Sequence, residues 1–365
     1  MEFYLPTRLL SGRHILRQKS SLFRELGRSC LLLTGGNSVK TCGALDETES
    51  ALRDAGVSFE VFSGITANPS IDVCVRAGRR AAELGVDFVL GVGGGSVLDA
   101  AKASALSAAN SELDGDGLYA AAELKRALPI ALVGTTAGTG SEVTAVAVIT
   151  DHAGRKHSFR QDDLYATLAF GDPRYTETMP LSLTAATGVD ALAHCMESWF
   201  CKNANAFSKA AALEGVRLLV PPLQTVAAGK IPSADERDAL YEGSVFGGVA
   251  ISVTATIFPH NLGYYLTEQY GLPHGFACAV FEPELLRHAE KADPAGLRQL
   301  CAAAGLSAQE LIALIRALTP KLSFRLSQEE IETILPRWKD VNAIRNTVGD
   351  LTLEDVRAFW SRLSE

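Results

Sequence analysis

The segment GVGGGSVLDAAK, residues 91–102, follows the apolar run FVL at 88–90 and leads into a stretch with the apolar spacing of a helix. A strand that ends in consecutive glycines and turns directly into a helix is typical of an open parallel sheet. Glycine lets the backbone approach a ligand closely, and the first helical turn offers free N–H groups to a pyrophosphate. Ser96 replaces the third glycine of the standard dinucleotide fingerprint, and glycine clusters also form ordinary turns. The strand-to-helix setting favours nucleotide binding.

Short apolar runs and helical patterns alternate through the first half of the chain. The predicted strands are 30–34, 59–62, 88–92 and 129–133, and the predicted helices include 45–55 and 71–84. This alternation predicts a parallel sheet that is covered by helices on both faces. Ligands of such sheets bind beyond the carboxyl ends of the strands.

The second half is rich in Ala and Leu and has helical spacing, apart from one β-branched run at 249–257. Its predicted helices are 183–200, 206–219, 235–249, 294–304 and 353–363. We therefore predict an α/β fold with a Rossmann-like parallel-sheet domain, residues 1–178. An all-α helical domain, residues 179–365, follows it, and the ligand cleft is expected between the two.

Length and composition indicate a globular protein and exclude several functions. The 365 residues are 47% hydrophobic and 21% charged, which suits two packed domains. The net charge of -8 argues against a nucleic-acid partner. The seven cysteines include no C-x-x-C pair, which indicates reduced thiols in a cytoplasmic protein. No secretion signal is visible, and the longest apolar run, 247–258, is too short to span a membrane.

A second polar loop follows the strand predicted at 129–133. The sequence TTAGTGSE, residues 135–142, offers hydroxyl groups and glycines that suit ribose and phosphate oxygens. Ser and Thr are also common in ordinary loops that cap a helix. Two such loops on neighbouring strands favour a nucleotide ligand over a pair of ordinary turns.

A set of metal-binding side chains comes next in the chain. Asp190 and His194 are four residues apart in a helical pattern, so both lie on one face, where they also suit an ordinary ion pair. His260 and His274 each follow a proline in a largely apolar segment, where a lone histidine is usually a core residue. Together the four residues offer one carboxylate and three imidazoles, which suit Fe(II) or Zn(II) better than Mg(II) or Ca(II).

Taken together, these motifs resemble the iron-containing, or group III, alcohol dehydrogenase family. The resemblance rests on GGGSVLDAAK at 93–102, TTAGTGSEVT at 135–144, GVDALAHCMESW at 188–199 and the PHG that ends at 275. It implies a metal-dependent alcohol dehydrogenase or aldehyde reductase that transfers a hydride between NAD(P)(H) and a small alcohol or aldehyde. It also implies a homodimer or a higher homo-oligomer.

The resemblance also implies roles for individual residues. The family's metal ligands match Asp190, His194, His260 and His274, and its active-site lysine matches Lys156. The bound metal is expected to act as a Lewis acid on the alcohol oxygen. The expected cofactor-binding residues, in addition to Lys156, are Gly36, Asn37, Ser38, Lys40, Gly93, Gly94, Gly95, Ser96, Asp99, Thr135, Thr136 and Thr139.

One position departs from the family pattern. Many members carry a further histidine four residues after the third ligand, and Tyr264 stands there in this chain. A tyrosine can relay a proton through its hydroxyl group, but its usual pKa is far above that of histidine. The alternative proton paths are water, the ribose or His157. Phe258 and Tyr264 are candidates to line the substrate pocket, with core packing as the simpler explanation.

The turn after the first predicted strand bears on the choice of cofactor. No Asp or Glu occurs between Thr34 and Gly43, where NAD enzymes usually hold the ribose 2′-hydroxyl with a carboxylate. Asn37, Ser38 and Lys40 suit a 2′-phosphate instead, as in the family's NADP-using butanol dehydrogenase and aldehyde reductase branch. We expect NADP(H) rather than NAD(H), while Lys40 as a solvated helix residue is the alternative.

Three other functions are compatible with the same motifs. A metal-dependent lyase or synthase of the dehydroquinate synthase-like type would use the same scaffold, but it needs several basic residues for an acidic substrate. The segment around His260 is apolar and aromatic instead. A polyol (glycerol-like) dehydrogenase is a second alternative. A nucleotide-binding module without catalysis is the third, and the complete set of four ligands argues against it.

Overall fold

The computed structural model describes residues 2–363, which form two compact units. One is an α/β unit made of Tyr4–Met179 together with Ser233–Gly248. The other is a helical unit that consists chiefly of Pro180–Pro232 and residues 249–363. A division into domains at residue 178 stays a prediction, because the α/β unit draws on two separate segments of the chain.

The α/β unit contains a parallel six-stranded sheet with the order β1-β8-β5-β4-β2-β3. Its strands are β1 (Arg8–Ser11), β2 (Ser29–Thr34), β3 (Ser58–Phe62), β4 (Phe88–Gly93), β5 (Ile130–Gly134) and β8 (Leu168–Gly171). In the register of β4 with β5, Gly93 lies opposite Gly134. The two glycine-rich loops therefore leave neighbouring strands at the same edge of the sheet, as predicted.

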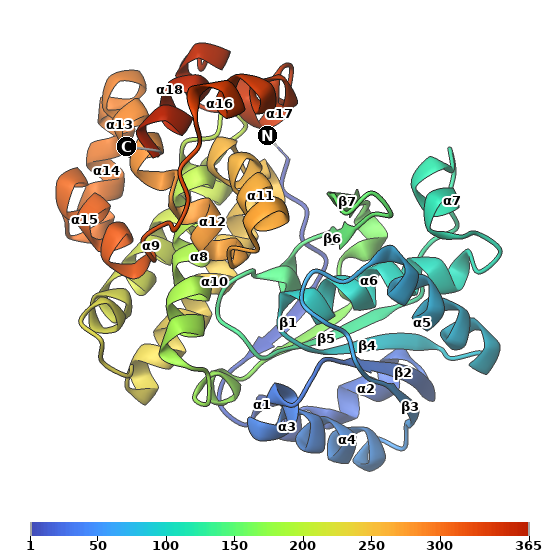
Figure 1. Ribbon diagram of the computed structural model, residues 1–365. Coiled ribbons are helices and arrows are strands. Elements are labelled where there is room, and N and C mark those ends of the chain that lie inside the picture. Colours follow the sequence, from blue (N-terminus) through green and yellow to red (C-terminus); the bar gives the residue numbers. More distant parts are fainter. Residues whose placement is uncertain (1, 364–365) are drawn as a thin grey trace. The chain divides into compact units, whose positions relative to one another are not determined.

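Helices cover both faces of this sheet (Figure 1). On one face, α5 (Ile71–Leu84) and α6 (Gly95–Ala109) pack on Leu31 and Leu33 of β2. The other face carries α1 (Ile15–Gln18), α2 (Phe23–Leu26), α3 (Ser38–Thr41) and α4 (Ala44–Asp54). Residues Cys30 to Thr34 of β2 are all buried, as expected for a parallel strand covered on both sides.

The α/β unit also contains one short helix and a small separate hairpin. The helix α7 (Gly115–Ala120) follows α6. The strands β6 (Val146–Thr150) and β7 (Lys156–Arg160) form a separate antiparallel hairpin. The sequence did not lead us to expect this hairpin, nor β1 and β8.

The helical unit contains α8 (Leu181–Trp199), α9 (Ala206–Ala227), α11 (Phe258–Tyr270), α12 (His274–Ala279), α13 (Glu282–Ala292), α14 (Pro294–Ala304), α15 (Ala308–Leu318), α16 (Gln328–Ile334), α17 (Asn342–Arg345) and α18 (Leu353–Leu363). The helix α10 (Ala234–Thr254) begins in the α/β unit and ends in the helical unit. It includes much of the β-branched run at 249–257, so helical context overrides β propensity there. Within residues 2–363, no single helix is long and apolar enough to cross a membrane, although two bent helix pairs together meet that criterion.

Candidate active site

The four predicted ligand residues come from three helices of the helical unit. Asp190 and His194 lie one turn apart on α8 and are 3% and 5% exposed. His260 lies in the first turn of α11 and is 2% exposed, and His274 is the first residue of α12. Pro259 and Pro273 precede the two histidines at the starts of their helices, where a missing N–H breaks no helical hydrogen bond.

The side chains of these four residues meet in one cluster. Oδ1 of Asp190 lies 3.5 Å from Nε2 of His260 and 3.9 Å from Nε2 of His274. The ring of His194 stacks on that of His260 with centroids 4.7 Å apart, and the rings of His260 and His274 meet edge to face at 5.3 Å. The structure thus brings together residues that are 84 positions apart in sequence.

Two glycines allow the three helices to approach so closely. A Cβ atom on Gly275 would lie 1.9 Å from the carbonyl oxygen of Ala186 and 2.8 Å from Cβ of Asp190. A Cβ atom on Gly263 would lie 2.8 Å from the backbone of Ala277. The first contact joins α12 to α8 and the second joins α11 to α12, so both glycines are needed where the ligand residues converge.

The cluster fits a metal ion. Oδ1 of Asp190 and Nε2 of His260 are buried and make no hydrogen bond, although buried polar atoms normally have a partner. Two nitrogen or oxygen ligands of one tetrahedral ion lie roughly 3.4 Å apart, close to the distance between these two atoms. Burial alone would raise the pKa of Asp190, but the neighbouring imidazoles hold it below its usual range. A cation between these atoms would satisfy both.

A carboxylate behind His260 orients its ring. Glu197 on α8 accepts a hydrogen bond from Nδ1 of His260 and another from the backbone N–H of Ile257, the latter at 2.7 Å. The other ring nitrogen, Nε2, then faces Asp190 with its lone pair, as in many metal-binding histidines. No motif in the sequence singles out Glu197, which lies three residues after His194 on the same side of α8.

A second carboxyl group is buried beside Glu197. Both oxygens of Glu282 are buried and make no hydrogen bond of ordinary geometry. Burial raises the pKa of Glu282 well above its usual value, and the charge of Glu197 raises it further. Glu282 therefore holds its proton more tightly than an exposed glutamic acid does. No motif in the sequence marked this residue.

Cys278 also reaches the cluster. Its Sγ lies 3.6 Å from Nδ1 of His274 and 3.9 Å from Nε2. Burial raises the pKa of this thiol to about 11. Cys278 follows His274 by four residues, the same spacing that marked Asp190 and His194, so the sequence held a signal that we did not use.

The two aromatic candidates for the substrate pocket differ in their surroundings. Phe258 is fully buried and stacks on Phe359 with centroids 4.8 Å apart, so core packing, the simpler of the two explanations, accounts for it. Tyr264 is partly buried and stacks on His274 at 5.6 Å. Burial raises the pKa of Tyr264 to about 12, so its hydroxyl group does not ionise near neutral pH.

In the α/β unit, the two glycine-rich loops pack against each other. A Cβ atom on Gly94 would lie 3.0 Å from Cγ2 of Thr136, and one on Gly95 would lie 2.5 Å from Cγ2 of Thr139. Gly94 is the N-cap of α6, a helix of 15 residues whose first-turn N–H groups suit a pyrophosphate. Side chains at these glycines would force the loops apart.

Asp99 and Lys102 of α6 hold the second loop in place. Asp99 accepts hydrogen bonds from Oγ of Ser141 at 2.7 Å and from the backbone N–H of Val148 at 3.0 Å. Nζ of Lys102 donates to the carbonyl oxygens of Ser141 and Val146 at 2.6 and 2.9 Å, and also to two hydroxyl groups. Both carboxylate oxygens of Asp99 therefore accept a hydrogen bond that holds the second loop beside α6.

The same loop contacts the segment of α10 that belongs to the α/β unit. Gly140 has a φ of +58°, and a Cβ atom on it would lie 2.6 Å from Cα of Gly248. The carboxylate of Glu142 accepts a hydrogen bond from the hydroxyl group of Tyr241 at 2.9 Å, and both side chains are buried. Residues 233–248 thus complete the wall behind this loop.

Thr135 is buried, and its backbone N–H donates to the carbonyl oxygen of Gly93 at 3.0 Å, whereas several other predicted residues lie nearer the surface of the α/β unit. Lys156 begins β7, and its charge helps to lower the pKa of Asp99, which burial raises. His157 is exposed on one side and stacks on Tyr119 at 4.4 Å. The expected 2′-phosphate residues at the end of β2 are all exposed: Gly36, Asn37, Ser38 and Lys40.

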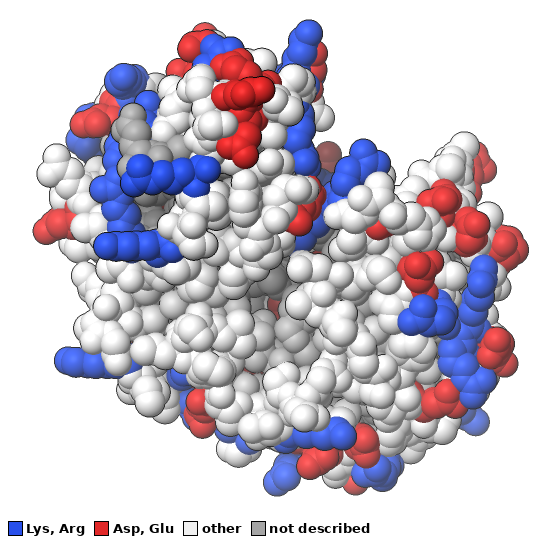
Figure 2. Space-filling model, viewed as in Figure 1, with Lys and Arg blue, Asp and Glu red and all other residues white. Residues whose placement is uncertain are grey.

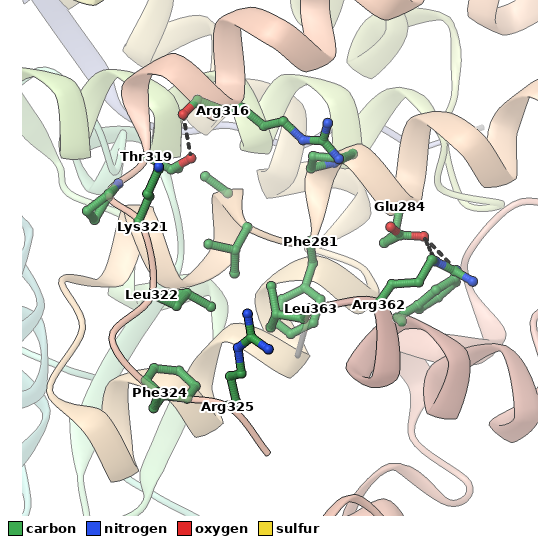
Figure 3. Close-up of a pocket in the computed structure, with 15 residues that line it drawn as sticks. Phe281, Glu284, Arg316, Thr319, Lys321, Leu322, Phe324, Arg325, Arg362 and Leu363 are labelled. Atoms are coloured by element: carbon green, nitrogen blue, oxygen red, sulfur yellow. Dashed lines mark hydrogen bonds and ion pairs between the residues drawn. The ribbon is translucent and has the colours of Figure 1, made fainter. Parts of the chain in front are cut away.

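A cavity of about 480 Å³ lies elsewhere in the helical unit (Figure 3). It is lined by the cations Arg316, Lys321 and Arg325 and by apolar side chains such as Phe324. Figure 2 shows Lys and Arg side chains gathered over the C-terminal helices on this side of the unit. None of the four predicted ligand residues lines the cavity, so this hollow is separate from the buried cluster.

Comparison with known proteins agrees with this geometry. The sequence matches the profile of iron-containing alcohol dehydrogenases over residues 6–173 and the profile of the C-terminal part of that family over residues 184–334. The chain belongs to the iron-containing alcohol dehydrogenase family. This alcohol dehydrogenase is therefore metal-dependent and NAD(P)-linked, and the resemblance found in its sequence is confirmed.

Similar proteins include several alcohol dehydrogenases. The NADPH-dependent butanol dehydrogenase of Clostridium saccharobutylicum is 26% identical over 341 residues, which are 90% of this chain and 86% of that protein. The 1,3-propanediol dehydrogenase of Citrobacter freundii is 35% identical over 280 residues, which are 73% of this chain and 70% of that protein. The crystal structure of an iron-containing alcohol dehydrogenase from Thermotoga maritima has a TM-score of 0.91 at 32% identity, over 100% of this chain and 99% of that chain.

Proposed function

We propose that this alcohol dehydrogenase transfers a hydride between NADP(H) and a small alcohol or aldehyde at a metal ion held by Asp190, His194, His260 and His274. The convergence of one carboxylate and three imidazoles carries the proposal, because two of their facing atoms are buried without a hydrogen bond. The similar proteins named above for butanol and 1,3-propanediol support a short substrate.

The metal site would accept Fe(II) or Zn(II), and the family name favours iron. When bound, the metal supplies a Lewis acid that lowers the pKa of an alcohol or polarises an aldehyde carbonyl. Asp190 contributes the negative charge of the ligand set. Glu197 holds His260 in the orientation that presents Nε2, and burial of the cluster limits the access of competing water.

The cofactor site would use the two packed loops. Backbone N–H groups of Gly94, Gly95 and Ser96 suit the pyrophosphate at the start of α6. The hydroxyl groups of the second loop would lie on the nicotinamide side, where Asp99 orders the loop. The residues that we assign to this second part of the site are Thr135, Thr136, Thr139 and Lys156.

We infer that NADP(H) is preferred over NAD(H). The turn after β2 carries Asn37, Ser38 and Lys40, all exposed, and it has no carboxylate between Thr34 and Gly43 to hold a ribose 2′-hydroxyl. The NADPH-dependent butanol dehydrogenase among the similar proteins supports the same choice. A lysine such as Lys40 near the ribose 2′-position would favour NADP(H), because it would attract the additional negative charge of the 2′-phosphate.

The test is to purify the enzyme without added metal, measure its metal content, and follow the oxidation of NADPH and NADH by short aldehydes. We expect bound iron or zinc, reduction of butanal, and a kcat/KM at least roughly tenfold higher with NADPH, the factor that corresponds to one charge-assisted contact. Lys40→Ala should lower the ratio of kcat/KM with NADPH to kcat/KM with NADH. Asp190→Ala should lose both the bound metal and the activity. Absence of bound metal together with absence of oxidation with every aldehyde would show the proposal to be wrong.

We further infer a homodimer or a higher homo-oligomer in the cytoplasm. The family resemblance supports the assembly, and the free cysteines support a reducing compartment. Sedimentation equilibrium tests the assembly, because a mass near 38.8 kDa would be that of a single chain.

A further inference from the structure

Cys278 lies in the buried cluster with three of the proposed metal ligands. It follows His274 by one helical turn on α12, so both side chains lie on the same face of that helix. One ligand atom from each of Asp190, His260, His274 and Cys278 lies within 4.8 Å of all the others. Cys278 is fully buried, so its thiol faces this cluster and not solvent.

The distances are those of atoms that share one ion. A sulfur at about 2.3 Å and a nitrogen at about 2.1 Å from a tetrahedral ion lie roughly 3.6 Å apart. Sγ of Cys278 lies 3.6 and 3.9 Å from the two ring nitrogens of His274. An ion placed among these atoms is therefore within reach of the sulfur with little movement.

An independent observation shows where the ion would sit. Oδ1 of Asp190 and Nε2 of His260 belong to side chains that are 3% and 2% exposed, and neither atom has a hydrogen bond. Both atoms are members of the same group of four as the thiol. Among residues 2–363, no other cysteine belongs to such a group, which sets Cys278 apart from the remaining thiols.

We propose that Cys278 is a sulfur ligand of the metal centre, in addition to the histidine and aspartate ligands, and that it shifts metal preference toward thiophilic ions. The inference rests on the proposed metal centre. On binding, the S–H bond breaks and a sulfur–metal bond forms, the proton leaves to solvent, and the metal keeps its oxidation state. Thiolate favours Zn(II) and other soft ions over Mn(II), whereas imidazole and carboxylate discriminate less.

Cobalt(II) substitution tests the proposal through a spectrum and not through activity. The full-length enzyme is stripped with a chelator and reloaded with Co(II), and the bound cobalt is counted. We expect visible ligand-field bands from the site and, in addition, a near-ultraviolet sulfur-to-cobalt charge-transfer band. Cys278→Ser should keep the bound cobalt and the ligand-field bands but lose the charge-transfer band.

Cys195→Ser is the matched control, because Cys195 is also fully buried and follows His194 on α8 but does not belong to the cluster. It should keep the charge-transfer band. The ratio of Cd(II) to Mn(II) affinity should fall roughly tenfold or more in Cys278→Ser, as for other changes around a metal centre, and should not change in Cys195→Ser.

The outcomes separate this inference from the proposed function. Absence of bound cobalt in the unmodified enzyme would overturn both. Bound cobalt with ligand-field bands and no charge-transfer band would overturn the role of Cys278 alone. If Cys278→Ser does not fold, X-ray absorption of the zinc-loaded unmodified enzyme decides, because a sulfur neighbour at about 2.3 Å supports the proposal and a shell of only nitrogen and oxygen overturns it.

Discussion

Glu197 accepts a hydrogen bond from Nδ1 of His260, and its other oxygen accepts one from the backbone N–H of Ile257 at 2.7 Å. One carboxylate thus fixes both the ring of a proposed metal ligand and the chain just before α11. The contact also determines which ring nitrogen faces Asp190, so a residue outside the ligand set controls the geometry of the centre.

We therefore predict that Glu197→Ala weakens metal binding by about 10- to 100-fold, the usual effect of removing a partner of a metal-binding histidine. Competition with a chromogenic chelator measures the affinity. Glu197→Gln should weaken binding less, because its amide oxygen can still accept from Nδ1 of His260. Equal affinities for the Ala variant and the unmodified enzyme would contradict this role.

Lys102→Met should destabilise the α/β unit by about 3–5 kcal/mol, because it removes a fully buried donor to the carbonyl oxygens of Ser141 and Val146 and a cation near the partly buried Asp99. The affinity for NADPH should fall as well, since Lys102 orders the second loop. Urea unfolding and fluorescence titration measure the two effects. Lys125→Met is the control: its ion pair with Glu112 is exposed, so its loss should cost less than about 1 kcal/mol.

Tyr264→Phe should reduce kcat by less than about tenfold, because a hydroxyl group with a pKa of about 12 is poorly matched to proton transfer near neutral pH. The dependence of kcat on pH should have the same shape in Tyr264→Phe as in the unmodified enzyme. Tyr264→His should add a new limb near the usual histidine pKa of about 6.5. A loss of about 10²- to 10⁴-fold in the Phe variant, typical of a missing proton-transfer group, would instead assign the relay to Tyr264.

His152 should make the stability of the α/β unit depend on pH. It lies between Asp72 and Asp116, at 3.0 and 2.9 Å, and hydrogen bonds to both raise its pKa above 6.5. Because the folded-state pKa is raised, the stabilisation is fully present below pH 6.5 and is lost as the pH rises through the raised value.

Melting temperatures at two pH values test whether the stabilisation by His152 is lost as the pH rises. His152→Asn should melt below the unmodified enzyme at about pH 5.5 and together with it at about pH 9, where the imidazole is neutral in both the folded and the unfolded state. A difference of the same size at both pH values would mean that the imidazole acts through packing and not through charge.

Much of the α/β unit could be predicted because hydrophobic runs and glycines mark parallel strands directly. The helix predicted at 71–84 has those bounds in the structure, and the strand predicted at 30–34 extends by one residue. The edge strand β1 was missed because it is only four residues long and is partly exposed, so it lacks the fully apolar run that marks the central strands. The helix predicted at 206–219 is longer in the structure: α9 continues through Pro221 and Pro222 to Ala227, although prolines usually stop helices.

In the candidate site, too, local sequence patterns could be predicted and tertiary contacts could not. The four proposed ligand residues could be singled out because the i, i+4 spacing and the Pro-His steps are local patterns, and the structure shows that their side chains meet. Glu197 and Glu282 could not be predicted, because their importance comes from a packing contact between different helices. The hydrogen bonds of Asp99 to Ser141 and Val148 could not be predicted either, because they join residues that are far apart in the sequence.

The α/β unit is discontinuous in sequence, and this has a consequence for the order in which the enzyme matures on the ribosome. Glu142 cannot meet Tyr241, and Gly140 cannot meet Gly248, until about a hundred further residues have been synthesised. The sheet can form early from the nascent chain, but the loop after β5 must wait for α10. A fragment ending at residue 178 would therefore have strands without a finished cofactor pocket, and cofactor binding would report that synthesis had passed residue 248.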